Sequence, residues 1–107
     1  MNFAVNIIRL VLSIPKTEMY YLLGRQLLRS GTSVGANYRA ACRAKSKADF
    51  ISKMTTVEEE CDESIYWMEV LIRSDAMKQQ VLEPLMNEAD EILAMVVSSI
   101  RTARSNR

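Results

Sequence analysis

The stretch Gly24–Phe50, GRQLLRSGTSVGANYRAACRAKSKADF, combines positive charge with a high density of small side chains. Its basic residues are Arg25, Arg29, Arg39, Arg43, Lys45 and Lys47, and its only acid is Asp49. Its small residues include Ser30, Gly31, Ser33, Gly35, Ala36, Ala40, Ala41 and Ala44. Small side chains let a neighbouring helix approach closely. One segment therefore offers both a helix-packing face and a surface of fixed positive charge.

The small residues keep the three-to-four-residue spacing of a helix face through Gly31 and Gly35, so we predict one continuous helix from near Thr17 to about Ala44. At about 100° per residue, four arginines of this helix fall close to one line and form a ridge about 27 Å long. They are Arg25, Arg29, Arg39 and Arg43. A break between the two glycines would instead divide the ridge in two.

Downstream, Ser46 begins the sequence SKAD, which is typical of a helix start because the serine hydroxyl can accept a bond from a backbone N–H of the first turn. The apolar stripe that follows has helical spacing and consists of Phe50, Met54, Val57, Cys61, Ile65, Met68 and Ile72. Tyr66, Trp67, Val70 and Leu71 widen it at the far end. After a turn at Ser74 and Asp75, we predict a fourth helix from Val81 to Ile100, with Pro84 in its first turn.

Upstream, a first helix is predicted from the stripe Phe3, Ile7, Leu10 and Ile14, and Pro15 should end it. Its other faces are apolar as well, at Val5, Ile8, Val11 and Leu12. A helix that is apolar on most sides must be covered on more than one side. In a chain of 107 residues this points to a subunit interface.

Four helices with short connections predict an all-α fold, an antiparallel up-down four-helix bundle. The length of 107 residues indicates a single domain over residues 1–107, and 49% apolar residues are ample for its core. We expect this domain to assemble as a homo-oligomer, because of the excess of apolar surface on its first helix.

The net charge is only +1, but it is distributed unevenly along the chain. Residues 1–57 hold nine basic and two acidic groups, whereas residues 58–100 hold two basic and eleven acidic groups. Such asymmetry indicates either a polyanion-binding face or pairing of the two halves within one fold. Internal pairing would bring the arginine ridge to Glu58, Asp62 and Glu69, which flank the core stripe of the third helix.

Signatures of catalysis and of metal binding are absent from the sequence. There is no histidine, and Cys42 and Cys61 form no CxxC pair, so a structural zinc site is not expected. The sequence GTSVG lacks the spacing and the lysine of a phosphate-binding loop. We therefore predict neither an enzyme nor a cofactor or metal. Both cysteines are expected to be reduced core thiols of a cytoplasmic protein, since the sequence has no signal peptide and no membrane span.

The basic segment is the one group of residues in the sequence that indicates a function. Arginine binds phosphate bidentately, and a row of arginines can neutralise a nucleic-acid backbone without reading its sequence. Tyr20, Tyr21 and Tyr38 could stack on unpaired bases, or they could be ordinary bundle-edge residues. The terminal Arg101, Arg104 and Arg107 could favour the C-terminal dipole of the fourth helix or form a nucleic-acid-binding tail.

The combination RSGTSVGAN, SKADF and YWME resembles a bacterial family of small four-helix-bundle proteins, the 23S rRNA intervening-sequence proteins. The accessory variability determinant of diversity-generating retroelements is similar to that family. The resemblance implies a homopentamer with a basic, nucleic-acid-associated surface, which in the retroelement relatives assists a reverse transcriptase and its template RNA. One departure is Ala40, where the family generally has Glu, and it limits what can be carried over at Asn37 and Arg39.

The leading hypothesis is a non-enzymatic homopentameric scaffold that binds structured RNA or DNA, RNA above all. Its phosphate contacts would be Arg25, Arg29, Arg39, Arg43, Lys45 and Lys47. The alternative is a protein–protein interaction module in which the arginines are structural and no nucleic acid is bound.

Overall fold

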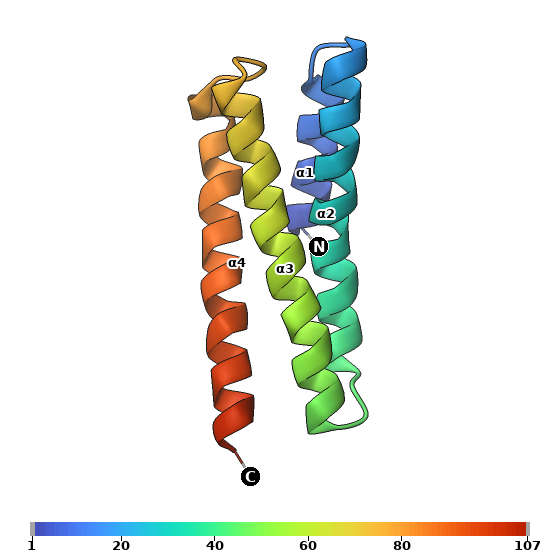
Figure 1. The fold of residues 1–107 in the computed structure, drawn as a ribbon, viewed down its shortest axis with the longest axis vertical. Helices are drawn as coiled ribbons and strands as arrows, with labels where there is room; N and C mark the ends of the chain where they lie inside the picture. The colour runs from blue at the N-terminus through green and yellow to red at the C-terminus, as the bar shows by residue number, and fades with distance from the viewer. Residues whose placement is uncertain (1, 107) are drawn as a thin grey trace.

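The computed structural model describes residues 2–106, whose backbone forms four α-helices. They are α1 (Asn2–Ser13), α2 (Glu18–Cys42), α3 (Lys47–Arg73) and α4 (Gln79–Ser105). Figure 1 shows the helices packed against one another, with the chain reversing its direction at each connection. The described part of the chain contains no strand, so the predicted all-α class with four helices is confirmed.

Hydroxyl caps fix the starts of α2 and α3. The Tyr20 backbone N–H donates to the Thr17 hydroxyl at 3.2 Å, and the Asp49 N–H donates to the Ser46 hydroxyl at 3.0 Å. These bonds satisfy N–H groups that have no partner within the helix. The predicted starts are therefore confirmed, and α2 runs without a break through both glycines.

The fourth helix is longer than predicted at both ends. It begins at Gln79, so Pro84 is its sixth residue, and the prediction that this proline lies in the first turn is wrong. The prolyl nitrogen has no hydrogen to donate to the Gln80 carbonyl four residues earlier. Gln80 is exposed, so water can bond that carbonyl in place of the helix. Because α4 begins with Gln79 and Gln80, the apolar spacing alone placed its start two residues too late.

The core draws on all four helices, and the predicted apolar stripes of α1 and α3 supply a large part of it. Its fully buried side chains include Ile7, Leu27, Met54, Val57, Cys61, Met68, Leu71, Leu82 and Val96. Two buried serines join α2 to α3, since the Ser64 hydroxyl donates to the Ser30 hydroxyl at 3.0 Å. The Ser30 hydroxyl can itself donate to the Leu27 carbonyl at 3.3 Å. A polar link therefore crosses the core without leaving either serine unpaired.

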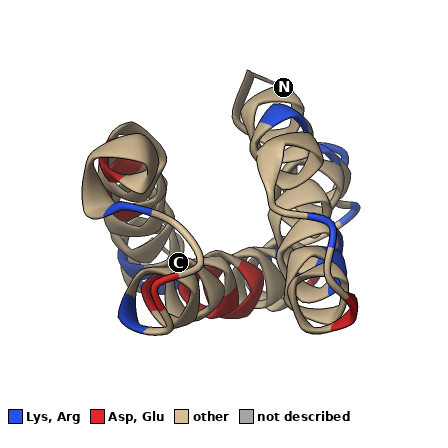
Figure 2. Ribbon diagram, turned by 90° about the horizontal axis from the view of Figure 1, so that it is seen from above, with Lys and Arg blue, Asp and Glu red and all other residues tan. Residues whose placement is uncertain are grey.

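The first helix is short and packs mainly on α2. It has 12 residues against 25 in α2, so it covers only part of the length of the bundle. Figure 2 shows α1 and α4 on opposite sides, with α2 and α3 between them. At the closest approach, Ile7 lies over Gly31, where a Cβ atom would come within 2.8 Å of two Ile7 carbons. The glycine thus sets how closely α1 and α2 can pack.

The two cysteines lie in different environments. Cys61 is fully buried and its thiol donates to the Ala89 carbonyl at 3.2 Å, whereas Cys42 is exposed. The prediction of a core thiol is therefore wrong for Cys42. The residue lies near the end of α2, about 16 Å along the axis from Gly31. The short α1 does not cover that end.

We expect only the exposed Cys42 thiol to react with a disulfide reagent at about pH 8 in the native protein. After denaturation both thiols should react. Burial raises the pKa of the Cys61 thiol to about 11, so at that pH it is protonated as well as inaccessible. Counting labelled thiols by mass spectrometry tests this. A Cys42→Ser variant should remain unlabelled while folded, and rapid labelling of that variant would contradict the buried position of Cys61.

Candidate functional site

The continuity of α2 brings Arg25, Arg29 and Arg39 to one outer face, and Arg43 follows directly after the helix as its C-cap. We call Arg25, Arg29, Arg39 and Arg43 the basic ridge, and all four are exposed. Lys45 and Lys47, also exposed, follow at the connection to α3. In Figure 2 most Asp and Glu residues lie on the side formed by α3 and α4, whereas Lys and Arg residues lie on both sides. The side formed by α1 and α2 therefore carries few acids that could neutralise its cations.

Arg29 differs from the other three arginines because it is an ion-pair partner within the fold. Its guanidinium contacts the Glu60 carboxylate at 3.4 Å and also donates to the Glu63 carboxylate. The Trp67 indole N–H donates to the same Glu63 oxygen at 3.4 Å. This network ties α2 to α3 at the surface, and the Arg29 charge is partly neutralised by two carboxylates of the same chain.

The prediction that the ridge pairs with Glu58, Asp62 and Glu69 is wrong. Within residues 2–106 none of the three forms an ion pair. Glu60 and Glu63 lie on the side of α3 that carries Ser64 towards α2. Glu58 instead lines a groove with Val97 and Ile100 of α4. Asp62 and Glu69 are exposed on a face turned away from α2.

Four basic residues gather where α2 meets α3, and we call Arg39, Arg43, Lys45 and Lys47 the basic end. Over the described chain, none of these side chains forms an ion pair. The nearby Asp49 carboxylate pairs with Lys53 at 2.8 Å and accepts the Lys45 backbone N–H at 3.2 Å. These bonds, the Lys53 one above all, hold the pKa of Asp49 below its ordinary value. The i, i+4 spacing of Asp49 and Lys53 could have indicated this pair from sequence.

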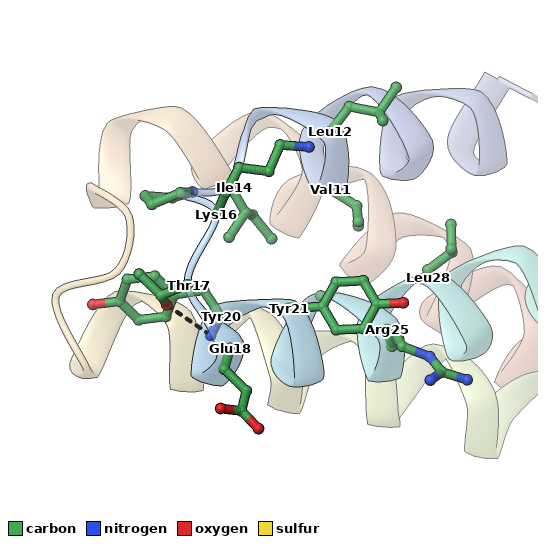
Figure 3. Close-up of a pocket in the computed structure, with 12 residues that line it drawn as sticks. Val11, Leu12, Ile14, Lys16, Thr17, Glu18, Tyr20, Tyr21, Arg25 and Leu28 are labelled. Carbon is green, nitrogen blue, oxygen red and sulfur yellow. Dashed lines mark hydrogen bonds between the residues drawn. The ribbon is translucent and has the colours of Figure 1, made fainter.

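Arg25 lies at the opposite end of the ridge, about 21 Å along the helix axis from Arg39. Its guanidinium is 5.8 Å from the centroid of the Tyr21 ring. Both residues line a groove between α1 and α2, shown in Figure 3. Of the predicted tyrosines, Tyr20 and Tyr21 lie at this groove, whereas Tyr38 is on another face of α2, about 140° round from Arg25.

The structure therefore divides the six predicted basic residues into three groups. Four form the basic end, Arg29 is engaged with α3, and Arg25 belongs to the groove. Sequence reasoning missed Lys16, which lines the same groove from the connection between α1 and α2. Among residues 2–106 no three Cys, Asp or Glu side chains are grouped to hold a metal ion. No helix in that range is long and apolar enough to span a bilayer.

Comparison with known proteins gives a family and a structural relative. The profile of the 23S rRNA-intervening sequence protein family matches residues 1–98. The fold is similar to the crystal structure of a protein of unknown function from the S23 ribosomal protein family of Bacteroides thetaiotaomicron VPI-5482. The two chains are 38% identical, each is covered over 92% of its length, and the TM-score is 0.87. The comparison with curated proteins gave no match.

Proposed function

The chain belongs to the 23S rRNA-intervening sequence protein family, and from that premise we propose that it is a non-enzymatic homo-oligomeric scaffold that binds structured nucleic acid, RNA above all. The observation that carries the proposal is the basic end. Four exposed cations lie together there, and none is neutralised by an acid within residues 2–106. Charges left unpaired at a surface are available to a polyanion.

The chemistry of these side chains favours contacts with phosphate over contacts with bases. Guanidinium groups bind phosphate oxygens in a bidentate manner, and ammonium groups bind them as point charges. Such contacts position a nucleic acid but carry no sequence information. The scaffold would therefore bind many sequences, and its affinity would fall as salt displaces it from the backbone.

Self-association is the second part of the proposal. Val5 and Ile8 form an exposed apolar face of α1, with exposed fractions of 38% and 42%. A contiguous apolar face of this kind marks an interaction surface. The family resemblance favours a pentamer. It also favours a role beside a reverse transcriptase and its template RNA.

We expect fluorescently labelled structured RNA and duplex DNA to bind with an affinity that falls steeply with salt. The logarithm of the binding constant should fall linearly with the logarithm of salt between about 50 and 300 mM, with a slope near −4 if one chain supplies four phosphate contacts. Fluorescence anisotropy measures both quantities. Absence of binding at the lowest salt would contradict the proposal and would favour a protein-interaction module.

The oligomer is tested separately by light scattering. A mass of 12.2 kDa that does not change with concentration would show a monomer and would contradict the scaffold assembly. Binding of RNA by such a monomer would still support the phosphate contacts, so the two parts of the proposal can fail independently.

A further inference from the structure

A groove between α1 and α2 forms a surface hollow that the basic end does not use. Its volume is about 690 Å³. Its apolar walls come from Val11 and Leu12 on α1, from Ile14 directly after that helix, and from Tyr20, Tyr21 and Leu28 on α2. Gly24 closes the floor, since a Cβ atom there would stand 3.4 Å from the side chains of Val11 and Ile14. The groove is thus open to solvent on its outer side, and packed side chains form its floor.

The groove places an aromatic ring between two cations. Tyr21 is 63% exposed, and Figure 3 shows its ring lying along the groove on α2, below Val11. The Arg25 guanidinium approaches this ring at 5.8 Å, and Lys16 extends along the α1 side. Glu18, the only acid that lines the groove, points away from α1 in the same view.

We propose that this groove binds an unpaired base of a single-stranded nucleic-acid segment, an inference that rests on the proposed function. The base would stack on the Tyr21 ring, and the adjacent phosphates would lie at Arg25 and Lys16. Aromatic rings beside cations are the common means by which proteins bind single strands. A base inside a duplex has both faces covered, so only an unpaired segment could enter.

The cations of the groove and its position at one end of the basic ridge favour a nucleic-acid strand over an apolar peptide. Arg25 is the first member of the basic ridge, so a strand held at Tyr21 could continue along α2 towards Arg39, about 21 Å away. A purely apolar partner would leave the Arg25 and Lys16 charges without a counterpart. Stacking on Tyr21 uses the flat face that every base has and does not depend on the base edges. Binding should therefore tolerate any base.

The experiment compares Tyr21→Ala with Tyr21→Phe on a single-stranded RNA and on a duplex of the same sequence. Loss of the ring should weaken single-strand binding by about 5- to 150-fold, since stacking contributes about 1–3 kcal/mol per base. Duplex affinity and both salt slopes should not change, because no phosphate contact is removed. Phenylalanine should retain full single-strand affinity, since it keeps the stacking face.

Arg25→Ala is the matched control, and it should lower the single-strand salt slope by about 1. Equal losses on single strand and duplex, or no loss in Tyr21→Ala, would overturn the groove assignment. So would a smaller oligomer mass in Tyr21→Ala by light scattering, because the groove would then be a contact with a second copy. If the unaltered protein binds no nucleic acid, the proposed function and this inference both fail. If the basic end binds but Tyr21 has no effect, only this inference fails.

Discussion

Replacement of Gly31 by alanine should destabilise the protein, although alanine is the better helix former. The new methyl group would stand 2.8 Å from two carbons of Ile7, which is fully buried and cannot turn away freely. Overpacking of this kind costs about 1–3 kcal/mol, against a gain of at most about 1 kcal/mol in helix propensity. We expect a net loss of about 1–2 kcal/mol in the free energy of unfolding, measured by urea denaturation.

Gly35 supplies the control within the same helix. A Cβ atom there meets nothing within 4 Å, so Gly35→Ala should raise stability by roughly 0.5–1 kcal/mol. A double-mutant cycle with Ile7→Ala should show that Gly31→Ala does less harm once the isoleucine is removed. Equal stabilisation by the two alanines would contradict the close approach of α1 and α2.

Removing Arg39 and Arg43 together should abolish about half of the phosphate contacts that one chain makes. The slope of log affinity against log salt should become shallower by about 2, and affinity should fall for all sequences alike. Stability should change little, because neither arginine forms an ion pair within residues 2–106. Anisotropy titrations and urea denaturation of the same samples measure the two effects.

Arg29→Ala is the counterpart on the same ridge. Its guanidinium is engaged by Glu60 and Glu63, so its loss should leave the salt slope nearly unchanged. The cost in stability should be about 1 kcal/mol or less, since both partners are partly exposed. If Arg29→Ala reduced the slope as much as the double variant did, the division of the ridge into structural and binding arginines would be wrong. A folded Arg39→Ala, Arg43→Ala variant with unchanged affinity would exclude the basic end as the site.

The elements that local chemistry determines were predictable from the sequence. The hydroxyl caps at Thr17 and Ser46 and the helical spacing of small residues through Gly31 involve neighbours within one or two turns. The start of α4 was harder to predict, because the helix begins with two polar residues, Gln79 and Gln80, and has no side-chain cap. Pro84 therefore looked closer to the helix start than it is.

The partners of the charged residues were not predictable in the same way. The apolar stripe of α3 shows which face enters the core, but not which flank turns to α2 and which to α4. That choice depends on packing between helices, and it decides that Glu60 rather than Glu58 meets Arg29. Cys42 was misplaced for a related reason, since the limited reach of α1 is a property of the assembled bundle. The six basic residues were visible in the sequence, but their division into three groups depends on these tertiary contacts.

The order of the helices around the bundle also affects how the protein acquires its structure. The principal contacts join α1 to α2, α2 to α3 and α3 to α4, all of them neighbours along the chain. Short connections mean that little loop entropy is lost when each pair forms. Proteins dominated by such local contacts fold on the microsecond-to-millisecond timescale. Each hairpin could therefore form as it leaves the ribosome, and α1, held mainly by α2, could dock without waiting for α4.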